Sequence, residues 1–493
     1  MVTRRGLLSG AALAGAGALV GVARGTGVAE AAQPLNTPFT PVSVPHLVQA
    51  EQMVQYQRML AAGQLTEGLA GHWPLDGTAT DRADSAHTLT RGAGTAWTKL
   101  RAGGELGFDG TANAYSATTS VLDTTKPFTV SAWVRLAEGV PLDNIFTAVS
   151  QDGAQTSRFL LMYQDTPGAW VFRVRSANQA ARAEVVATTA PVPGRWTHLA
   201  GVWDNGTLRI YVDGRREGSV TDTSTTAWAA DQGFNIGRAK WDGAPVNRWN
   251  GSISDVRAFA RALSDQDVDL ISGQAAKRNN VYLIGEEAEV VWGDPGDPAG
   301  WVNRSRCNSF TTAVLRHTYK WAENGSYFTQ WFGTDHPTAA RYQSRFAGND
   351  GGAGPHFKAV TKVTDLQPGD LVSVNYQGTV DGNTGHIVMV REVKGVRTGW
   401  MDQADRTQYV VEVIDCTASP HGVYGTATYE PYPDTRMVDN LPDTETLNRA
   451  GAGIGHMVFY AKADGSFGGH RWSVNSGTWH PETEHAITAG RVV

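Results

Sequence analysis

Cys307, His386 and Asp415 have side chains that suit nucleophilic catalysis on a carbonyl group. In such a unit a thiolate attacks the carbonyl carbon, an imidazole moves the protons, and a carboxylate holds the imidazole in one orientation. Cys307 opens the segment CNSFTTAVLRHTYKW, in which apolar residues recur at helical spacing as far as Asn324-Gly325. Because the start of a helix favours an anion, we expect Cys307 to be the nucleophile.

His386 and Asp415 belong to two expected strands that can pair with each other. His386 opens the strand GHIVMVREV, and Asp415 ends the strand QYVVEVID. If the two strands pair antiparallel, Ile387 lies opposite Ile414, and His386 and Asp415 become cross-strand neighbours. Directly opposed residues have Cβ atoms about 5 Å apart and share a face, so the carboxylate can hold the imidazole.

Two alternatives to this unit stay open. An even number of cysteines in an exported protein suggests a disulfide between Cys307 and Cys416, although the strand pleat points Cys416 away from the face of Asp415. His421, in TASPHG, is the second choice of base if the strand register differs. The other histidines lack metal-site spacing, so we expect no cofactor for the chemistry.

The order of these elements is similar to that of the papain-like superfamily in its bacterial NlpC and CHAP branch. By that resemblance Cys307 is the nucleophile, His386 the general base and acid, and Asp415 the orienting residue, while the Cys307 N–H helps to bind the oxyanion. The chain departs from the branch at Arg306-Cys307-Asn308-Ser309, where Asp-Cys-Ser-Gly is usual, and no upstream Gln or Tyr is clearly placed. The resemblance implies an α+β papain-like domain over 274–493.

Residues 66–273 show a different pattern, that of an all-β sandwich. Segments such as FTVSAWVRL, RFLLMYQ and THLAGVWD alternate or run apolar between turn residues, with Asp213-Gly214 as a hairpin turn and Trp133 and Trp196 as core anchors. HWPLDG, LGFDG, GRWTHLAGVWDNGTLRIYVDGR, FNIGR and WNGSISDVRAFARALSDQDV follow one another as in a laminin-G-like (concanavalin A-like) jelly roll, which this region resembles.

Relatives of that fold hydrolyse glucans, bind glycans or bind proteins, so the fold alone leaves the role open. The glucanase branch carries Glu-x-Asp-x-x-Glu for its paired carboxylates, and this spacing is missing, which argues against a hydrolytic sandwich. Four tryptophans in loop-like or strand-end positions are candidates for stacking on sugar rings, with core packing as the alternative for each: Trp170, Trp228, Trp241 and Trp249.

Asp84 and Asp255 resemble positions at which such jelly rolls hold a structural calcium ion. Carboxylate oxygens suit this hard cation, but two residues supply far fewer than the six to eight oxygen ligands it takes. A structural calcium in the jelly roll is therefore one option that the sequence leaves open.

The first 32 residues predict export. Arg4-Arg5 precede a mild Ala/Gly/Leu/Val stretch that ends in small residues near Ala29 and Ala32, which resembles a twin-arginine signal; an ordinary secretory leader is the alternative. We expect residues 33–65 to form a Pro-rich linker followed by a short packing helix. No later stretch has the length needed to cross a bilayer.

The whole chain of 493 residues is long enough for two domains of roughly 200 residues each. A net charge of −6 with 18% charged residues argues against a generally basic nucleic-acid binder. We expect a secreted bacterial multidomain protein in which a cysteine hydrolase cleaves an amide of cell-wall peptide and the jelly roll binds glycan or surface polymer. The rival hypothesis is a non-catalytic carbohydrate-binding or adhesion protein with an inactive papain-like domain.

Overall fold

The computed structural model describes residues 43–493, except 84, 99, 102–103, 112–115, 284–286, 381, 423–430 and 438–449. The export signal expected over 1–32 and the candidate calcium ligand Asp84 lie outside the described residues. Among the residues that are described, no helix combines the length and the apolar character that a membrane span requires.

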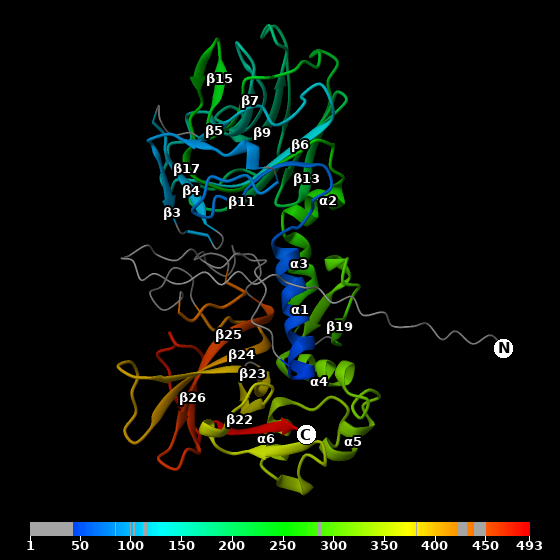
Figure 1. Ribbon diagram of the computed structural model, residues 1–493, viewed down its shortest axis with the longest axis vertical. Coiled ribbons are helices and arrows are strands. Elements are labelled where there is room, and N and C mark those ends of the chain that lie inside the picture. Colours follow the sequence, from blue (N-terminus) through cyan, green and yellow to red (C-terminus); the bar gives the residue numbers. More distant parts are fainter. Residues whose placement is uncertain are drawn as a thin grey trace, which may run out of the picture. The chain divides into compact units, whose positions relative to one another are not determined.

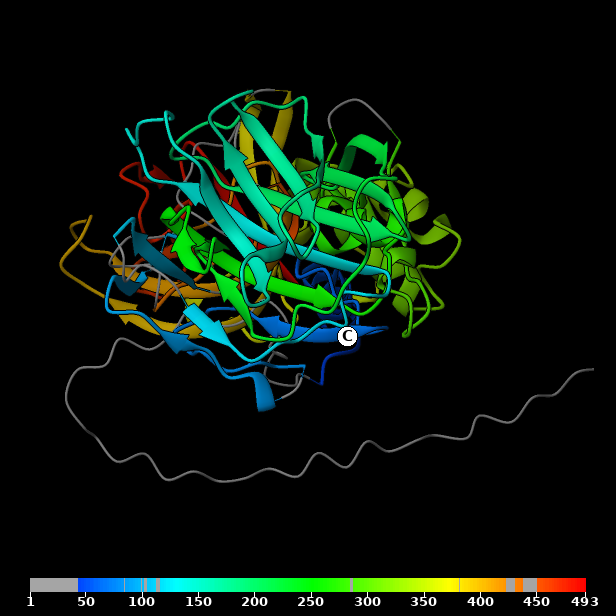
Figure 2. The ribbon, with the colours of Figure 1, turned by 90° about the horizontal axis from the view of Figure 1, so that it is seen from above.

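Two antiparallel sheets occupy the described part of the chain between residues 69 and 259 (Figures 1 and 2). The first contains, in spatial order, β13 (Arg215–Thr221), β12 (Thr207–Val212), β11 (Thr197–Asp204), β6 (Phe128–Leu136), β17 (Asn250–Phe259), β4 (Glu105–Asp109) and β3 (Thr95–Thr98), with β1 (Leu69–Trp73) on β17. The second contains β10 (Arg182–Val186), β9 (Ala169–Arg175), β8 (Ser157–Gln164), β7 (Phe146–Asp152), β14 (Gly233–Ile236), β5 (Ser116–Thr118) and β2 (Thr90–Arg91). A separate ribbon pairs β15 (Ala239–Trp241) with β16 (Ala244–Val246), and η1 (Ser85–His87) is a single turn.

Apolar side chains from both sheets form one shared core, as in a β-sandwich. Trp133 and Trp196 are buried as predicted, each with 4% of its surface exposed. Asp213 and Gly214 have φ of 48° and 80°, the backbone that a two-residue hairpin turn requires. Gly201 on β11 faces Phe172 on β9 of the other sheet. A Cβ at Gly201 would lie 2.2 Å from the Phe172 ring, so only glycine lets these two strands pack so closely.

The second half of the described chain combines helices with a long antiparallel sheet. Its helices are α2 (Asp265–Ile271), α3 (Gln274–Asn279), η2 (Pro298–Gly300), α4 (Cys307–Thr318), α5 (Ser326–Phe332), α6 (Ala339–Phe346), η3 (Asn349–Gly351) and η4 (Val363–Asp365). The sheet runs in the order β21 (Phe357–Val360), β28 (Ala486–Val492), β22 (Leu371–Val380), β23 (Asn383–Arg397), β24 (Thr407–Thr417), β25 (Gly451–Ala461), β26 (Phe467–Arg471) and β27 (His480–Pro481). A small sheet contains β18 (Asn280–Tyr282), β20 (Val302–Ser305) and β19 (Glu289–Val291).

The central strands of this long sheet are buried on both faces, because alternate side chains enter two separate clusters. Ile387 and Ile414 belong to the cluster that contains Cys307 and the apolar faces of α4, α5 and α6. Val388 and Val413, one residue along each strand, belong to the cluster on the opposite face.

The packing helix expected after the linker is α1 (Pro45–Ala61), longer than anticipated at 17 residues (Figure 1). It packs against α3 and α4, and Leu47 enters the Cys307 cluster. Polar contacts fix the same helix: the His46 ring bonds Tyr319 Oη at 2.8 Å, and Glu51 pairs with Arg391 of β23 at 2.6 Å.

Helix α4 begins at Cys307, as predicted, and ends earlier than Asn324-Gly325 suggested. The chain leaves the helix at Tyr319, whose backbone is extended, and Gly325 instead adopts the left-handed backbone before α5. The first turn is fixed by the Arg306 N–H, which donates to Ser309 Oγ at 2.8 Å.

The register between β23 and β24 differs from the expected one by two residues, since Met389 and not Ile387 lies opposite Ile414. Bulges between Val390 and Glu392 and between Val393 and Gly395 lengthen β23. Because the shift is even, every side chain keeps its face. His386 and Asp415 are no longer directly opposed but stay on one face.

We predict that Leu47→Ala destabilises the protein by about 2–5 kcal/mol, because the side chain is fully buried and its loss leaves a cavity beside α4. The matched control is Gln52→Ala on the exposed side of α1, which should change stability by less than about 0.5 kcal/mol. Urea unfolding measures both. Equal effects of the two substitutions would mean that α1 does not contribute to this core.

Candidate active site

Cys307 is the first residue of α4. The backbone N–H groups of the first helical turn, including that of Cys307, have no hydrogen-bond acceptor within the helix. The Cys307 side chain is 4% exposed and borders a pocket of about 350 Å³. Other residues of the pocket wall are Asn308, Ser309, His336, Thr338 and Gly385. A molecule in this pocket therefore lies against Cys307.

His386 lies at the start of β23 and is 6% exposed. Gly385 permits this position, because a Cβ there would lie 1.9 Å from the Val374 carbonyl oxygen. The His386 Nε2 bonds Asp415 Oδ2 at 2.6 Å, which leaves Nδ1 for the Cys307 thiol. Burial lowers the pKa of His386, but the charge of Cys307 and hydrogen bonds to Asp415 and Cys307 outweigh it and raise that pKa.

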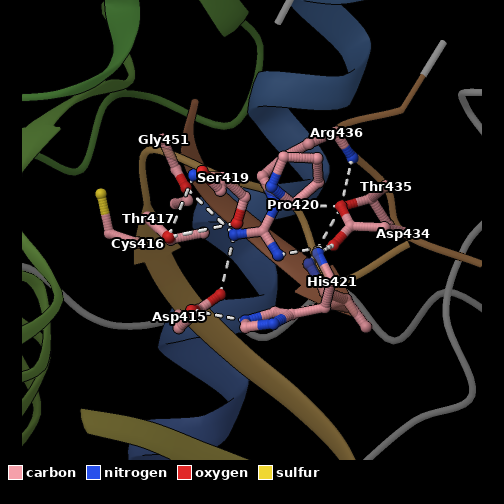
Figure 3. A network of polar contacts seen from close by, with 12 residues as sticks. Asp415, Cys416, Thr417, Ser419, Pro420, His421, Asp434, Thr435, Arg436 and Gly451 are labelled. Carbon is pink, nitrogen blue, oxygen red and sulfur yellow. Dashed lines mark hydrogen bonds and ion pairs between the residues drawn. The ribbon is translucent and has the colours of Figure 1, made fainter. Parts of the chain in front are cut away.

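Asp415, on β24, is buried and surrounded by positive or donor groups (Figure 3). Arg436 Nη1 bonds its Oδ1 at 2.8 Å, and His421 Nε2 bonds its Oδ2 at 2.9 Å. Burial raises the pKa of Asp415, but the charges of Arg436 and His421 outweigh it and hold that pKa well below its usual range. Asp415 is therefore a carboxylate that accepts from His386.

His421 was the alternative base, and the structure gives it another place. Its Nδ1 faces the Trp472 carbonyl oxygen at 2.7 Å, and its Nε2 faces Asp415. Both partners are oxygen atoms, so the two ring nitrogens are directed at Trp472 and Asp415. His421 therefore supports Asp415 in this structure, and His386 stays the proposed base.

Arg436 and Asp434 complete a buried polar cluster with Asp415 and His421 (Figure 3). The Arg436 guanidinium donates to Asp434 Oδ2 at 2.7 Å, and Asp434 Oδ2 also accepts the His421 backbone N–H at 2.7 Å. One guanidinium thus pairs with two buried carboxylates, which offsets part of the cost of burying these charges. The sequence analysis missed both residues, which lie on a loop without periodicity.

Two further aromatic side chains border the triad. Trp472, in the segment after β26, has its ring centroid 4.7 Å from that of His386 and covers one side of the imidazole. Tyr282 on β18 was not predicted from the sequence. Burial is the largest cause that raises its pKa, and the charges of Cys307 and Cys416 raise it further. Its hydroxyl donates to Asn383 Oδ1 at 3.0 Å. The signal was a tyrosine ending a short strand upstream of the cysteine.

Cys307 and Cys416 are both free thiols in the structure. Figure 3 shows the Cys416 sulfur pointing away from the Arg436 cluster, and it lies 3.2 Å from the Ser305 carbonyl oxygen. The pleat therefore separates Cys416 from Asp415 as expected, although Cys416, and not Asp415, faces the helices. Burial raises the pKa of Cys416 to about 11, so this thiol is protonated at neutral pH.

The ligating atoms of His386, Asp415 and His421 lie within 4.8 Å of one another, close enough to consider a metal ion. The arrangement does not fit one, because Asp415 already accepts from both rings and from Arg436. Asp255 does not fit calcium either. Its carboxylate bonds His72 at 2.8 Å and Arg257 at 2.8 Å, and these donors occupy both oxygens.

The four candidate sugar-stacking tryptophans differ in how much of the side chain is exposed. Trp170 and Trp249 are 2% and 0% exposed and stack within the sandwich core, and Trp228 is half-buried. Trp241, at the end of β15, is 41% exposed. It borders a second pocket, of about 520 Å³.

Several solved structures are similar to part of this chain. Domain 4 of AbnA, an extracellular arabinanase from Geobacillus stearothermophilus, solved with arabinotriose, is 19% identical, covers 41% of this chain and 98% of its own, and has a TM-score of 0.36. A SAP-like pentraxin from Limulus polyphemus is also 19% identical, covers 34% of this chain and 81% of its own, and has a TM-score of 0.29.

An uncharacterized protein of Acanthamoeba polyphaga mimivirus is 27% identical over 234 residues, which are 45% of this chain and 93% of the viral protein. Residues 109–269 match the sequence model described as the concanavalin A-like lectin/glucanases superfamily. The jelly-roll resemblance is thus confirmed for this region. Residues 109–269 of the chain are a concanavalin A-like jelly-roll domain.

Proposed function

We propose that the chain is a secreted cysteine hydrolase of the papain-like superfamily that cleaves an amide bond. One observation carries the proposal: Cys307 on the first turn of α4 and Gly385, the neighbour of His386, line one pocket, and His386 Nε2 is bonded to a buried carboxylate at 2.6 Å. The charge of Cys307 is also among the causes that raise the pKa of His386, after the opposing effect of burial. The resemblance to the NlpC and CHAP branch makes cell-wall peptide the first substrate class to test.

The proposed reaction has two steps. The Cys307 thiolate adds to the amide carbonyl carbon, and the C–N bond breaks as the His386 imidazolium gives its Nδ1 proton to the leaving nitrogen. A water molecule then adds to the thioester while His386 takes a proton from it, and the C–S bond breaks to release a carboxylic acid. Asp415 holds the imidazole through Nε2 in both steps.

The oxyanion formed in each step needs donors. The Cys307 backbone N–H is available at the helix start. We assign the second donor to the Tyr282 hydroxyl, because it bonds Asn383, which lines the same pocket as Cys307.

The jelly-roll domain is proposed to bind carbohydrate and so to hold the hydrolase near its substrate. Trp241 supports this, because an exposed indole at a pocket offers a flat apolar surface to a sugar ring. The rival, a carbohydrate-binding protein without catalysis, is favoured by the same tryptophan and differs only in what Cys307 does.

Cys307→Ala should abolish release of amines from purified cell walls, whereas Cys416→Ala should keep it, because Cys416 is buried and protonated. Brief iodoacetamide treatment near neutral pH should alkylate Cys307 and leave Cys416 unmodified, since the thiolate is the reactive form. Peptide mass mapping identifies the labelled cysteine. A Cys307→Ala protein that hydrolyses as fast as the unaltered protein leaves the non-catalytic rival as the explanation.

Tyr282→Phe should lower kcat about 100-fold with little change in KM, because an oxyanion donor acts mainly in the transition state. Tyr56→Phe is the control, since its hydroxyl donates to the Pro295 carbonyl oxygen and to no residue of the candidate triad. Steady-state kinetics on a chromogenic amide separate the two constants. A change in KM alone would instead assign Tyr282 to substrate binding.

Arg436→Met should destabilise the fold by about 3–5 kcal/mol, because it leaves Asp415 and Asp434 buried without their cation. The pKa of Asp415 is lowered in the folded state, so its contribution is present above the unfolded pKa and is lost as pH falls through the folded pKa. The penalty should therefore be largest near pH 7 and shrink below about pH 4.

The control for this substitution is Arg304→Met, which removes an exposed pair with Glu289 and should cost no more than about 1 kcal/mol at any pH. Urea unfolding at several pH values measures both variants. A penalty for Arg436→Met that does not depend on pH would show that lost packing, and not charge, causes it.

A further inference from the structure

A second pocket lies on the jelly-roll domain, between the β9–β10 hairpin and the β15–β16 ribbon, and holds about 520 Å³. This size is ordinary for a small-ligand site. Polar and aromatic residues of its wall include Arg173, Arg175, Gln179, Arg182, Trp241 and Asn247.

The wall of the pocket is positively charged. Arg173 is neutralised by Glu184, with Nε 2.8 Å from Oε2, and Arg182 is 3.9 Å from the same carboxylate. Among the residues that the structure describes, no carboxylate forms an ion pair with Arg175 within 4.0 Å. The pocket wall thus holds three guanidinium groups, and one carboxylate, Glu184, pairs with only two of them.

Arg175 is the strongest sign of a missing anion. Only 7% of the residue is exposed, and its Nε has no hydrogen-bond partner. Its Nη1 makes two long bonds, to Thr156 Oγ1 at 3.2 Å and to the Lys240 carbonyl oxygen at 3.4 Å. Burying a cation without a counterion is costly, and an anion in the pocket would offset that cost.

Trp241 gives the pocket a flat aromatic wall. The Arg175 guanidinium carbon lies 4.4 Å from the Trp241 ring centroid, and 41% of Trp241 remains exposed. The side-chain amides of Gln179 and Asn247 are also in the wall and can exchange hydrogen bonds with hydroxyl groups. A cation, an indole face and amides together suit a sugar that carries an acidic group.

We propose that this pocket binds an acidic saccharide, with its carboxylate or phosphate at Arg175 and Arg182 and its ring against Trp241. The proposal rests on the carbohydrate-binding role proposed above and adds the ligand's charge. Arg175 provides a planar pair of donors for two anionic oxygens. Trp241 favours a saccharide over a phosphopeptide or a nucleic acid, which become outcomes of the test.

Titration calorimetry on the full, unaltered chain measures binding, because the probes contain no amide bond for Cys307 to attack. Trigalacturonate tests the carboxylate and its methyl ester is the neutral counterpart; phosphorylated maltotriose tests the phosphate and maltotriose is its counterpart. At least one acidic probe should bind tenfold or more tightly than its neutral form, and more weakly as salt is raised. Which pair shows this difference identifies the anion.

Arg175→Gln and Trp241→Ala should each weaken binding of the acidic probe at least tenfold. The matched controls are Arg215→Gln, an exposed arginine of β13, and Trp400→Ala, 48% exposed in the β23–β24 loop, and both should bind as before. If Arg175→Gln lowers the melting temperature, Arg182→Gln on the exposed rim provides the same comparison and should weaken binding severalfold.

Equal affinity for acidic and neutral probes, unchanged by Arg175→Gln, would overturn this inference and leave carbohydrate binding intact. Failure to bind any saccharide would overturn both. Binding of DNA or a phosphopeptide that is insensitive to Trp241→Ala would indicate a general anion surface and reject the saccharide. Amide hydrolysis is measured separately on the unaltered chain, so the outcome here does not bear on Cys307.

Discussion

The buried carboxylate of Asp415 is the charge on which the candidate active site depends. A carboxylate with no exposed surface is costly unless cations and donors surround it, and here Arg436, His421 and His386 do so. His386 is therefore oriented by a residue that is itself fixed from the opposite side. Asp434 extends this support by bonding both Arg436 and the His421 backbone. The position of His386 relative to Cys307 therefore depends on the loop that carries Asp434 and Arg436, which contains none of the three candidate catalytic residues.

The parts of this site that could be predicted from the sequence are those that depend on local periodicity. The helix start fixed the place of Cys307, and the period of two along β23 and β24 kept His386 and Asp415 on one face even though the register was wrong by two residues. Apolar alternation and the Asp213-Gly214 turn likewise predicted the sandwich strands.

The remaining features of the site depend on tertiary contacts, which cannot be predicted from the periodicity of the sequence. The bulges of β23 lengthen its hairpin with β24, and no residue type marks them. His421 is a histidine near Asp415 in the sequence, as a catalytic base could be, but only the folded chain shows that both of its ring nitrogens are directed at oxygen atoms of Trp472 and Asp415. Trp170 and Trp241 both end up beside turns, yet only the fold buries one and exposes the other. Tyr282 and Arg436 reach the site from segments with no motif.

Helix α1 has a consequence for the way the polypeptide is made. It leaves the ribosome early, yet Glu51 pairs with Arg391, a separation of 340 residues, and His46 bonds the carbonyl of Gly369 after 323 residues. Its packing partners α3 and α4 also follow it at a long distance in the sequence, so docking of α1 is a long-range closure that slows folding. A protein cut short before β23 would retain α3 and α4 but would leave Glu51 without its Arg391 partner.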